Sequence, residues 1–243
     1  MRRRLMLLRQ GGRVSNITRP DQSPWQTGLK ALVFLIASSC SVAAQSANPT
    51  DSAETIAKLK RAVVIVSTED KQHQALLQGT GFFISTDLIV TNMHVIRGAG
   101  LIRIKMFDGV TRDLQNVIAV NEKEDLALLQ LEKPEANVAV LQLAESVPAE
   151  GESILVMSNP RDSQWKLTRG RVGPIWQFKG TGKRFQITAS ILPGSSGGPV
   201  VNQEGRVVGI AAMHMESEDP LNFAVPAESL RALRASKSVA ILR

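Results

Sequence analysis

The sequence predicts an all-β protein built from two packed antiparallel β units, with short helices only near its ends. About twelve short segments alternate apolar and polar residues or form brief apolar runs, as strands do. A polar, proline-containing connection at residues 132–151 divides these segments into two groups. Helical spacing of apolar residues occurs only before the first group and after the last. The composition fits a soluble globular protein, because 43% of the 243 residues are hydrophobic and 21% are charged.

The first element expected in the body of the chain is a short helix that ends near residue 62. Residues 45–50 have the composition of a linker. Asp51, with Glu54 three residues later, matches an aspartate version of the capping box that begins helices. The apolar pattern then changes to period two, which predicts that the first β unit starts here.

Each β unit is expected to contain about six strands. Those of the first unit, about residues 62–131, are predicted at 62–67, 74–85, 88–91, 101–107, 110–120 and 126–131. Those of the second unit, about residues 152–226, are predicted at 153–158, 166–176, 184–190, 199–202, 206–213 and 221–225. Leucines at helical spacing predict a C-terminal helix over about residues 227–235.

Residues 1–44 have the pattern of a secretory signal peptide with a long basic front. Seven of the 29 Lys and Arg residues but only one of the 22 acidic residues lie here, so most of the net charge of +7 belongs to this leader. An uncharged stretch follows Lys30, and small residues up to Ala44 offer a cleavage site before Gln45. The stretch is shorter than the ~20 residues that cross a bilayer. An uncleaved N-terminal anchor and a buried helix are the alternatives.

The remainder of the chain argues against nucleic-acid binding. After residue 44 it holds 22 Lys and Arg residues against 21 acidic ones, so it carries no basic surplus of the size that binding to phosphates needs. The whole chain has no Tyr and only three Trp, which leaves few aromatic platforms for stacking on bases.

Cys40 is the only cysteine, and it lies in the leader. It matches a bacterial lipobox poorly, because Ala37 stands where that motif usually has leucine. Lipid attachment at Cys40 and an inert thiol in a discarded segment are both open, and membrane contact is expected only if the leader is retained or lipidated. Cleavage after Ala44 would leave no disulfide and no thiolate metal site. An exported domain of this kind suggests the bacterial periplasm or cell envelope.

Three segments carry residues suited to nucleophilic catalysis. His94 lies in TNMHV after one predicted strand, Asp125 begins DLALLQL, and Ser196 lies in the glycine-rich turn PGSSGGPV. Each type of residue in such a place is more often structural than catalytic. Together they match what an activated serine requires: an imidazole that accepts the hydroxyl proton, and a carboxylate that fixes the imidazole tautomer. The N–H groups of Gly194 and Ser196 are the candidate donors for an oxyanion, since glycine lets the chain aim them inward.

In the order His, Asp, Ser, these segments resemble those of trypsin-like serine proteases, and most of all the bacterial HtrA/Deg-type protease domain. Further matching segments are GTGFFIS at 79–85, SNP at 158–160, LTRGRV at 167–172 and LNFAVP at 221–226. The resemblance covers about residues 52–235. It implies two six-stranded antiparallel β-barrels with the active site between them, and a serine endopeptidase that acts on polypeptides, unfolded proteins among them.

The sequence departs from this family pattern in three ways. Ser195 stands where the family usually has Asn or Asp, and a small polar residue is expected to be tolerated there. No PDZ domain is expected before the chain ends at Arg243, so the regulated oligomer associated with that domain is in doubt and the oligomeric state stays open. The body also lacks the disulfides of animal trypsin-like enzymes, which favours the bacterial branch.

The motif frame G-x-S-G-G-P selects Ser196 rather than Ser195 as the nucleophile. The segment also fits G-x-S-x-G, the nucleophile elbow of α/β-hydrolases. That fold needs a helix after the serine, whereas residues 199–201 begin a predicted strand. It also needs a late acid and histidine, and only Glu204 and His214 are available, both within twenty residues of Ser196. The sequence therefore argues against the α/β-hydrolase fold.

The sequence predicts no cofactor and no metal site. Residues 179–183, KGTGK, look superficially like a phosphate loop but lack its G-x-x-x-x-G-K-[ST] frame, so a hairpin turn is expected there. The body has three histidines and no thiol, without metal-ligand spacing.

The resemblance also places the walls of the primary substrate pocket. No acid stands at Ser190, where a trypsin-like enzyme would have Asp, so a small or medium apolar side chain is expected as substrate rather than Arg or Lys. His214 would favour acidic side chains if it faced the pocket, and an ordinary surface histidine is the alternative. The candidate pocket residues are Ser190, Ile191, Leu192, Ala211, Ala212, His214 and Asn222.

The sequence thus predicts an exported serine endopeptidase in which Ser196 attacks, His94 acts as base and then acid, and Asp125 orients His94. A catalytically silent or latent relative that binds extended peptides between the two units is the first alternative. A structural β protein whose three motif matches are accidental is the second.

Overall fold

The computed structural model describes residues 52–114, 116–160, 165–215, 221–236 and 240–241. The chain divides into two parts, Met1–Ala44 and Gln45–Arg243. The first part, with the predicted leader and Cys40, lies outside the described residues. Within the described ranges, no helix combines the length and hydrophobicity needed to cross a bilayer.

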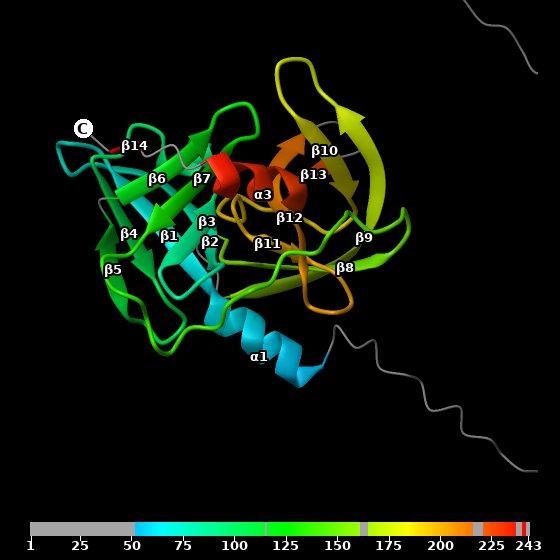
Figure 1. The fold of residues 1–243 in the computed structure, drawn as a ribbon, viewed down its shortest axis with the longest axis horizontal. Coiled ribbons are helices and arrows are strands. Elements are labelled where there is room, and N and C mark those ends of the chain that lie inside the picture. Colours follow the sequence, from blue (N-terminus) through cyan, green and yellow to red (C-terminus); the bar gives the residue numbers. More distant parts are fainter. Residues whose placement is uncertain (1–51, 115, 161–164, 216–220, 237–239, 242–243) are drawn as a thin grey trace, which may run out of the picture. The chain divides into compact units, whose positions relative to one another are not determined.

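The described residues form mostly β-strands, with three short helices (Figure 1). The helices are α1 (Ala53–Ala62), α2 (Met93–Ile96) and α3 (Ala227–Ser236). The strands of the first β unit are β1 (Val63–Glu69), β2 (Ala75–Phe83), β3 (Leu88–Thr91), β4 (Leu101–Lys105), β5 (Thr111–Leu114), β6 (Asn116–Asn121), β7 (Leu126–Gln130) and β14 (Ala240–Ile241). Those of the second are β8 (Ser153–Ser158), β9 (Lys166–Gln177), β10 (Lys183–Ile187), β11 (Pro199–Val201), β12 (Val207–Met215) and β13 (Leu221–Pro226).

The first β unit is a curled sheet whose described strands run in the order β14-β6-β7-β3-β2-β1-β4-β5. A closed six-stranded barrel was expected here, and the difference lies in one segment. The strand predicted over residues 110–120 corresponds to two described strands, β5 and β6, on either side of residue 115. β5 pairs with β4 and β6 pairs with β7, so consecutive segments of the chain reach both sides of the curled sheet. β14 adds a strand beside β6 that the sequence pattern did not indicate.

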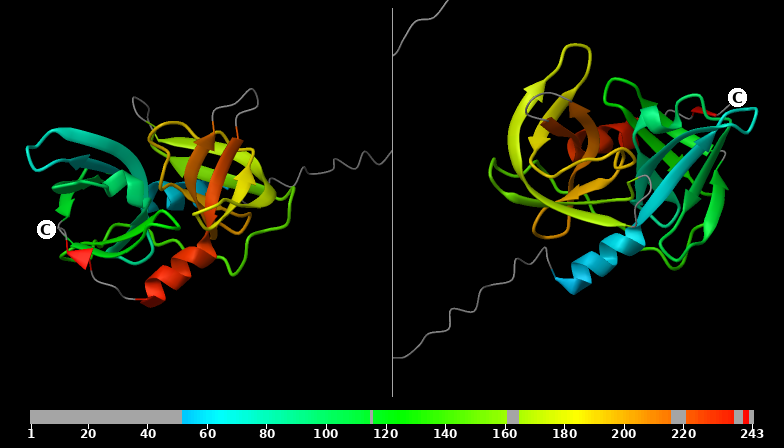
Figure 2. Two further views of the ribbon diagram at one scale, coloured as in Figure 1. Left: turned by 90° about the horizontal axis from the view of Figure 1, so that it is seen from above. Right: turned by 180° about the vertical axis from the view of Figure 1, so that it is seen from behind.

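The second β unit is the closed antiparallel barrel that was expected, with the order β10-β13-β12-β11-β8-β9. Its interior is filled by apolar side chains that alternate with outward-facing ones, and Phe185 and Ile187 from β10 are among them. Figure 2 shows the two units next to each other, each curled around its own interior. The all-β fold class is therefore confirmed.

A separate apolar cluster joins the two units. It combines Phe82 and Leu126 from the first unit, Leu155 from the second, Leu59 from α1 and Leu230 from α3. α3, red in Figure 2, contacts β6 and β7 as well as β12 and β13. Because apolar burial is the main stabilising term in folding, this shared core holds together the elements that carry the candidate site.

The start of α1 differs from expectation by one residue. The side chain of Ser52 accepts the Thr55 N–H at 3.1 Å, so Ser52 rather than Asp51 is the N-cap of α1. A serine hydroxyl caps a helix as well as a carboxylate does, and the sequence pattern alone did not separate the two neighbours. Residues 179–183 do form the predicted hairpin turn, between β9 and β10, with Gly180 at φ 82°.

Candidate active site

His94 and Asp125 form a short, two-point contact. His94 lies on α2, directly after β3, and Asp125 lies directly before β7. The His94 Nδ1 atom is 2.6 Å from Asp125 Oδ2, and the backbone N–H of His94 donates to Asp125 Oδ1 at 2.8 Å. Both carboxylate oxygens are thus held by one residue, which fixes the carboxylate against the imidazole ring. An imidazole held at Nδ1 in this way leaves Nε2 as the atom that can accept a proton.

The backbone of Asp125 is held in an unusual conformation. Its φ is 53°, in the left-handed region that non-glycine residues rarely enter and that costs about 1–3 kcal/mol. Two groups next to His94 hold it there: the Asn92 side chain donates to the Asp125 carbonyl at 2.8 Å, and the Met93 N–H donates to the same oxygen at 3.2 Å. Asn92 is fully buried and contributes no side-chain cap to α2. Asn92 was not among the predicted site residues, although it stands two residues before His94 in the same segment, TNMHV.

The turn before Ser196 carries the two predicted oxyanion donors, the N–H groups of Gly194 and Ser196. The Ser195 N–H donates to the Leu192 carbonyl at 2.8 Å, and Gly194 has φ 94°. A four-residue turn with Pro193 second and a positive-φ glycine third is a type II turn. Type I and type II turns differ in the orientation of the peptide between their second and third residues. The type II turn therefore fixes the direction of the Gly194 N–H. Neither the Gly194 N–H nor the Ser196 N–H donates a hydrogen bond to another described residue.

The two serines of this turn differ in their surroundings. Ser195 is 1% exposed, and its hydroxyl oxygen lies 3.1 Å from Ser158 Oγ and accepts the Leu192 N–H at 3.2 Å. Ser195 therefore braces the turn from inside, which accounts for a small polar residue at this position. Ser196 is half-buried, and among the described residues its hydroxyl makes no hydrogen bond, with His94 or with any other group.

β2 brings the Ser196 turn next to the helix that carries His94. The Thr80 N–H donates to the Ser196 carbonyl at 2.8 Å, and Thr80 Oγ1 donates to the Gly194 carbonyl at 2.7 Å. A Cβ atom built on Gly79 would lie 2.7 Å from Val95 Cγ2 and 3.0 Å from the Ser196 carbonyl oxygen. The Val95 side chain and the Ser196 carbonyl thus both lie close to Gly79.

Ala211 is the predicted pocket residue with the closest connection to this turn. Its carbonyl accepts the Gly197 N–H at 2.8 Å, and its own N–H donates to Gly198 at 2.9 Å. It is fully buried, as is Ile191, whereas Leu192 is 37% exposed.

The other predicted pocket residues are less closely defined. The Ser190 carbonyl lies 3.4 Å from Thr168 Oγ1, and Ala212 packs against the core shared by the two units. Asn222 pairs with Ile187 on β10 and, through the backbone, with His214 on β12. The side chain of His214 lies outside the described residues. The specificity expected from this pocket stays a prediction.

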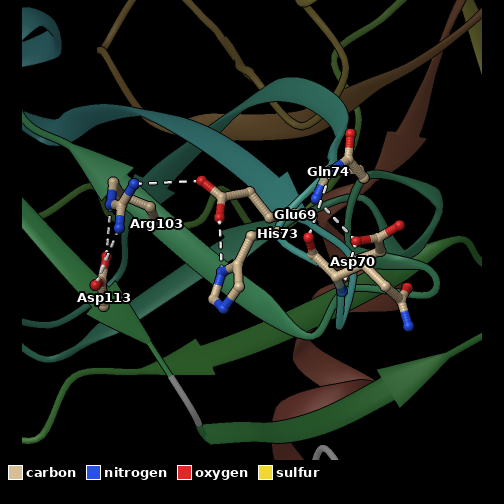
Figure 3. A network of polar contacts seen from close by, with 7 residues as sticks. Glu69, Asp70, His73, Gln74, Arg103 and Asp113 are labelled. Carbon is tan, nitrogen blue, oxygen red and sulfur yellow. Dashed lines mark hydrogen bonds and ion pairs between the residues drawn. The ribbon is translucent and has the colours of Figure 1, made fainter.

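Charged groups elsewhere in the first unit form a surface network rather than a second site. Arg103 donates to Asp113 at 2.6 Å and to Glu69 at 3.4 Å, and Glu69 also lies 3.3 Å from His73 Nδ1 (Figure 3). The contact with Asp113 raises the pKa of Arg103 above its ordinary value. Within the described part of the chain, no group of three or more His, Cys, Asp and Glu residues could hold a metal ion.

Comparison with known proteins shows which family shares these features. The family described as trypsin-like peptidase domain matches residues 79–210, which include Ser196, His94 and Asp125. The chain is 31% identical to serine protease HTRA1A from Danio rerio over 193 residues, covering 74% of the chain and 40% of the relative. It is 29% identical to the anti-sigma-I factor RsgI9 from Acetivibrio thermocellus over 171 residues, covering 70% of the chain and 24% of that protein. The chain thus spans less than half the length of these curated relatives.

Among solved structures, the chain is similar to the serine endoprotease from Yersinia pestis. The two share 26% sequence identity and superpose with a TM-score of 0.66, which covers 75% of this chain and 65% of the other. The predicted resemblance to trypsin-like proteases is thereby confirmed.

Proposed function

Because the chain belongs to the trypsin-like peptidase family, we propose that it is a serine endopeptidase that acts through Ser196, His94 and Asp125. The observation that carries the proposal is the two-point contact between His94 and Asp125, at 2.6 and 2.8 Å. A carboxylate held against Nδ1 favours the tautomer with the proton on that nitrogen and stabilises the imidazolium that forms during catalysis. Membership of the family and the geometry of the pair support the same chemistry.

In the proposed reaction, Ser196 Oγ attacks the carbonyl carbon of the scissile peptide bond, and its proton passes to His94 Nε2. The carbonyl oxygen becomes an oxyanion, which the N–H groups of Gly194 and Ser196 would receive. Each such donor is typically worth about 2.7–4 kcal/mol of barrier. The proton on His94 then passes to the leaving amine, the C–N bond breaks, and an acyl-enzyme remains. Water then attacks the ester carbonyl while His94 accepts its proton. This proton passes to Ser196 Oγ as the ester C–O bond breaks.

The substrate is proposed to be a polypeptide with a small or medium apolar side chain before the scissile bond. The support is the absence of an acid at Ser190 and the burial of Ile191 and Ala211. A buried carboxylate would be needed to bind Arg or Lys in such a pocket. Unfolded proteins suit this preference, because they expose apolar side chains in extended segments.

The site of action is proposed to be the bacterial periplasm or cell envelope. The support is the pattern of residues 1–44, in which a basic front precedes an uncharged stretch and small residues. Cleavage after Ala44 would give a mature chain that begins at Gln45 and contains no cysteine.

A fluorophosphonate probe tests the proposal directly, because it forms a covalent bond only with an activated serine. Ser196 Oγ attacks phosphorus, fluoride leaves, and the proton passes to His94. We expect the wild-type protein and Ser195→Ala to be labelled, whereas Ser196→Ala is not. Intact-mass spectrometry of the labelled protein secreted from a bacterial host also reports whether the leader has been removed before Gln45.

Wild-type protein that stays unlabelled, while folded by circular dichroism, would refute the enzyme proposal and favour the peptide-binding alternative. Loss of labelling in Ser195→Ala but not in Ser196→Ala would refute the assignment of the nucleophile.

A further inference from the structure

A buried arginine of the second β unit reaches the loop that carries Asp125. Arg184 lies on β10, and its side chain is only 2% exposed. Its Nη1 atom donates to Glu124 Oε2 at 3.0 Å and to the Lys183 carbonyl at 2.8 Å, and Nη2 donates to the Lys123 carbonyl at 3.5 Å. Its Nε atom is buried and has no partner among the described residues. Two of these hydrogen bonds reach Lys123 and Glu124, the residues directly before Asp125.

The contact is part of a wider docking of the β9–β10 hairpin on this loop. In Figure 1 the hairpin, yellow, lies beside the loop between β6 and β7, green. The Gly182 N–H donates to the Lys123 carbonyl at 3.2 Å. A Cβ atom on Gly182 would overlap the carboxylate of Glu124, so this carboxylate occupies the space that a side chain would fill. The hairpin of the second unit thus contacts the loop before Asp125, while Asn92 and Met93 of the first unit donate hydrogen bonds to the Asp125 carbonyl.

Stability alone gives little reason for this arrangement. Burying a charged pair removes both ions from water, and apolar residues of the same volume often serve the fold as well or better. Arg184 moreover leaves one buried donor unpaired, which is unfavourable. What the pair does supply is directional: a planar fork that fixes the position of one carboxylate and one carbonyl. Those two groups belong to Lys123 and Glu124, the residues whose backbone leads into the left-handed conformation of Asp125.

We propose that Arg184 and Glu124 are positioning residues for the His94–Asp125 pair. By fixing the loop before Asp125, the ion pair holds the Asp125 carboxylate against His94 and makes this contact depend on the second β unit. The kinetic consequence rests on the proposed protease function, whereas the structural consequence does not. Displacements of about 1 Å in a catalytic group can cost as much as about 10²-fold in rate.

The test measures the His94–Asp125 contact and the chemistry separately, in the full chain. In ¹⁵N-histidine-labelled protein, the Nδ1 proton of a histidine bonded to a carboxylate gives a low-field NMR resonance, which Asp125→Asn identifies by its loss. We expect Arg184→Lys and Glu124→Gln to shift or broaden this resonance. We also expect them to slow fluorophosphonate labelling about 10- to 10²-fold. In the Asp125→Asn background, neither substitution should slow labelling further, because both act through Asp125.

Matched controls separate positioning from general damage. Arg171→Lys makes the same change at an exposed arginine of β9, and Glu122→Gln makes it at an exposed acid of the same loop. Both should leave the resonance and the labelling rate unchanged. Thermal unfolding shows which variants are folded, and if Arg184→Lys does not fold, Glu124→Gln decides, since it keeps the shape of the side chain.

Three results distinguish the hypotheses. A wild-type resonance in both folded variants would overturn the proposal. So would rate losses that add fully to that of Asp125→Asn, because they would show a role independent of Asp125. Absence of labelling in the wild type would refute the protease function alone, and the NMR comparison would still decide whether Arg184 positions Asp125.

Discussion

Thr80 links three segments of the site, and replacing it by valine should loosen all three. It is fully buried on β2, where its hydroxyl donates to the Gly194 carbonyl at 2.7 Å and accepts the Asn159 N–H at 3.1 Å. Valine keeps the shape of threonine but removes both bonds. Each buried group left without a partner costs about 1–3 kcal/mol, and the extra apolar methyl group offsets part of that loss. We therefore expect Thr80→Val to lower the free energy of unfolding by about 2–4 kcal/mol.

Urea unfolding followed by circular dichroism measures this loss. For a domain of this size, about 2–4 kcal/mol corresponds to a fall in melting temperature of roughly 4–16 °C. Thr80→Ser is the matched control, because it retains the hydroxyl and loses only one methyl group, at a cost of about 1 kcal/mol. Thr111→Val makes the same chemical change on an exposed position of β5 and should be close to neutral. A wild-type free energy of unfolding in Thr80→Val, or an equal loss in Thr80→Ser, would refute this role of the Thr80 hydroxyl.

Two further substitutions test the backbone and the charge of particular sites. Gly197→Ala should destabilise the protein by more than about 2 kcal/mol and stop probe labelling, because Gly197 has φ 89° and its Cβ would overlap a backbone carbonyl of β2. Gly109→Ala, at φ 88° with open space around it, should cost only the backbone strain, and equal unfolding energies for the two would contradict this. Hydrogen bonds from Ser85 and Gln130 lower the pKa of Asp87 below its ordinary 3.8, so its stabilisation is present above that pH and is lost as the pH falls through the folded-state pKa. Asp87→Asn should therefore flatten the decline in stability as the pH falls below about 4, measured by urea unfolding, and an unchanged decline would show that Asp87 is not its source.

Most of the fold could be predicted from the sequence because the strands carry a strong local signal. β3 and β8 have the bounds that the apolar pattern predicted, and most other strands differ by one to three residues at an end. α2 was missed because four residues are too few to show a helical period. The division of residues 110–120 between two pairing partners was missed as well, because the alternation of apolar and polar residues does not show that β5 pairs with β4 whereas β6 pairs with β7.

The residue types of the candidate site could be read from the sequence, but the contacts that hold them could not. His94, Asp125 and Ser196 stand in motifs whose chemistry is specific. The positive φ of Asp125 had no local signal, because the residues that impose it lie elsewhere in the chain. Arg184 is 60 residues away in sequence from Glu124, and an arginine at the start of a predicted strand is ordinarily exposed.

The candidate site depends on contacts between the units more than on either unit alone. The first unit supplies His94 and Asp125, and the second supplies Ser196 on a turn whose carbonyls accept hydrogen bonds from Thr80. Arg184 makes the reverse connection, from the second unit to the loop before Asp125. Each half of the proposed catalytic group is thus held partly by the opposite unit. A displacement at this junction would therefore disturb the His94–Asp125 pair and the Ser196 turn together, so the two should be gained or lost as one.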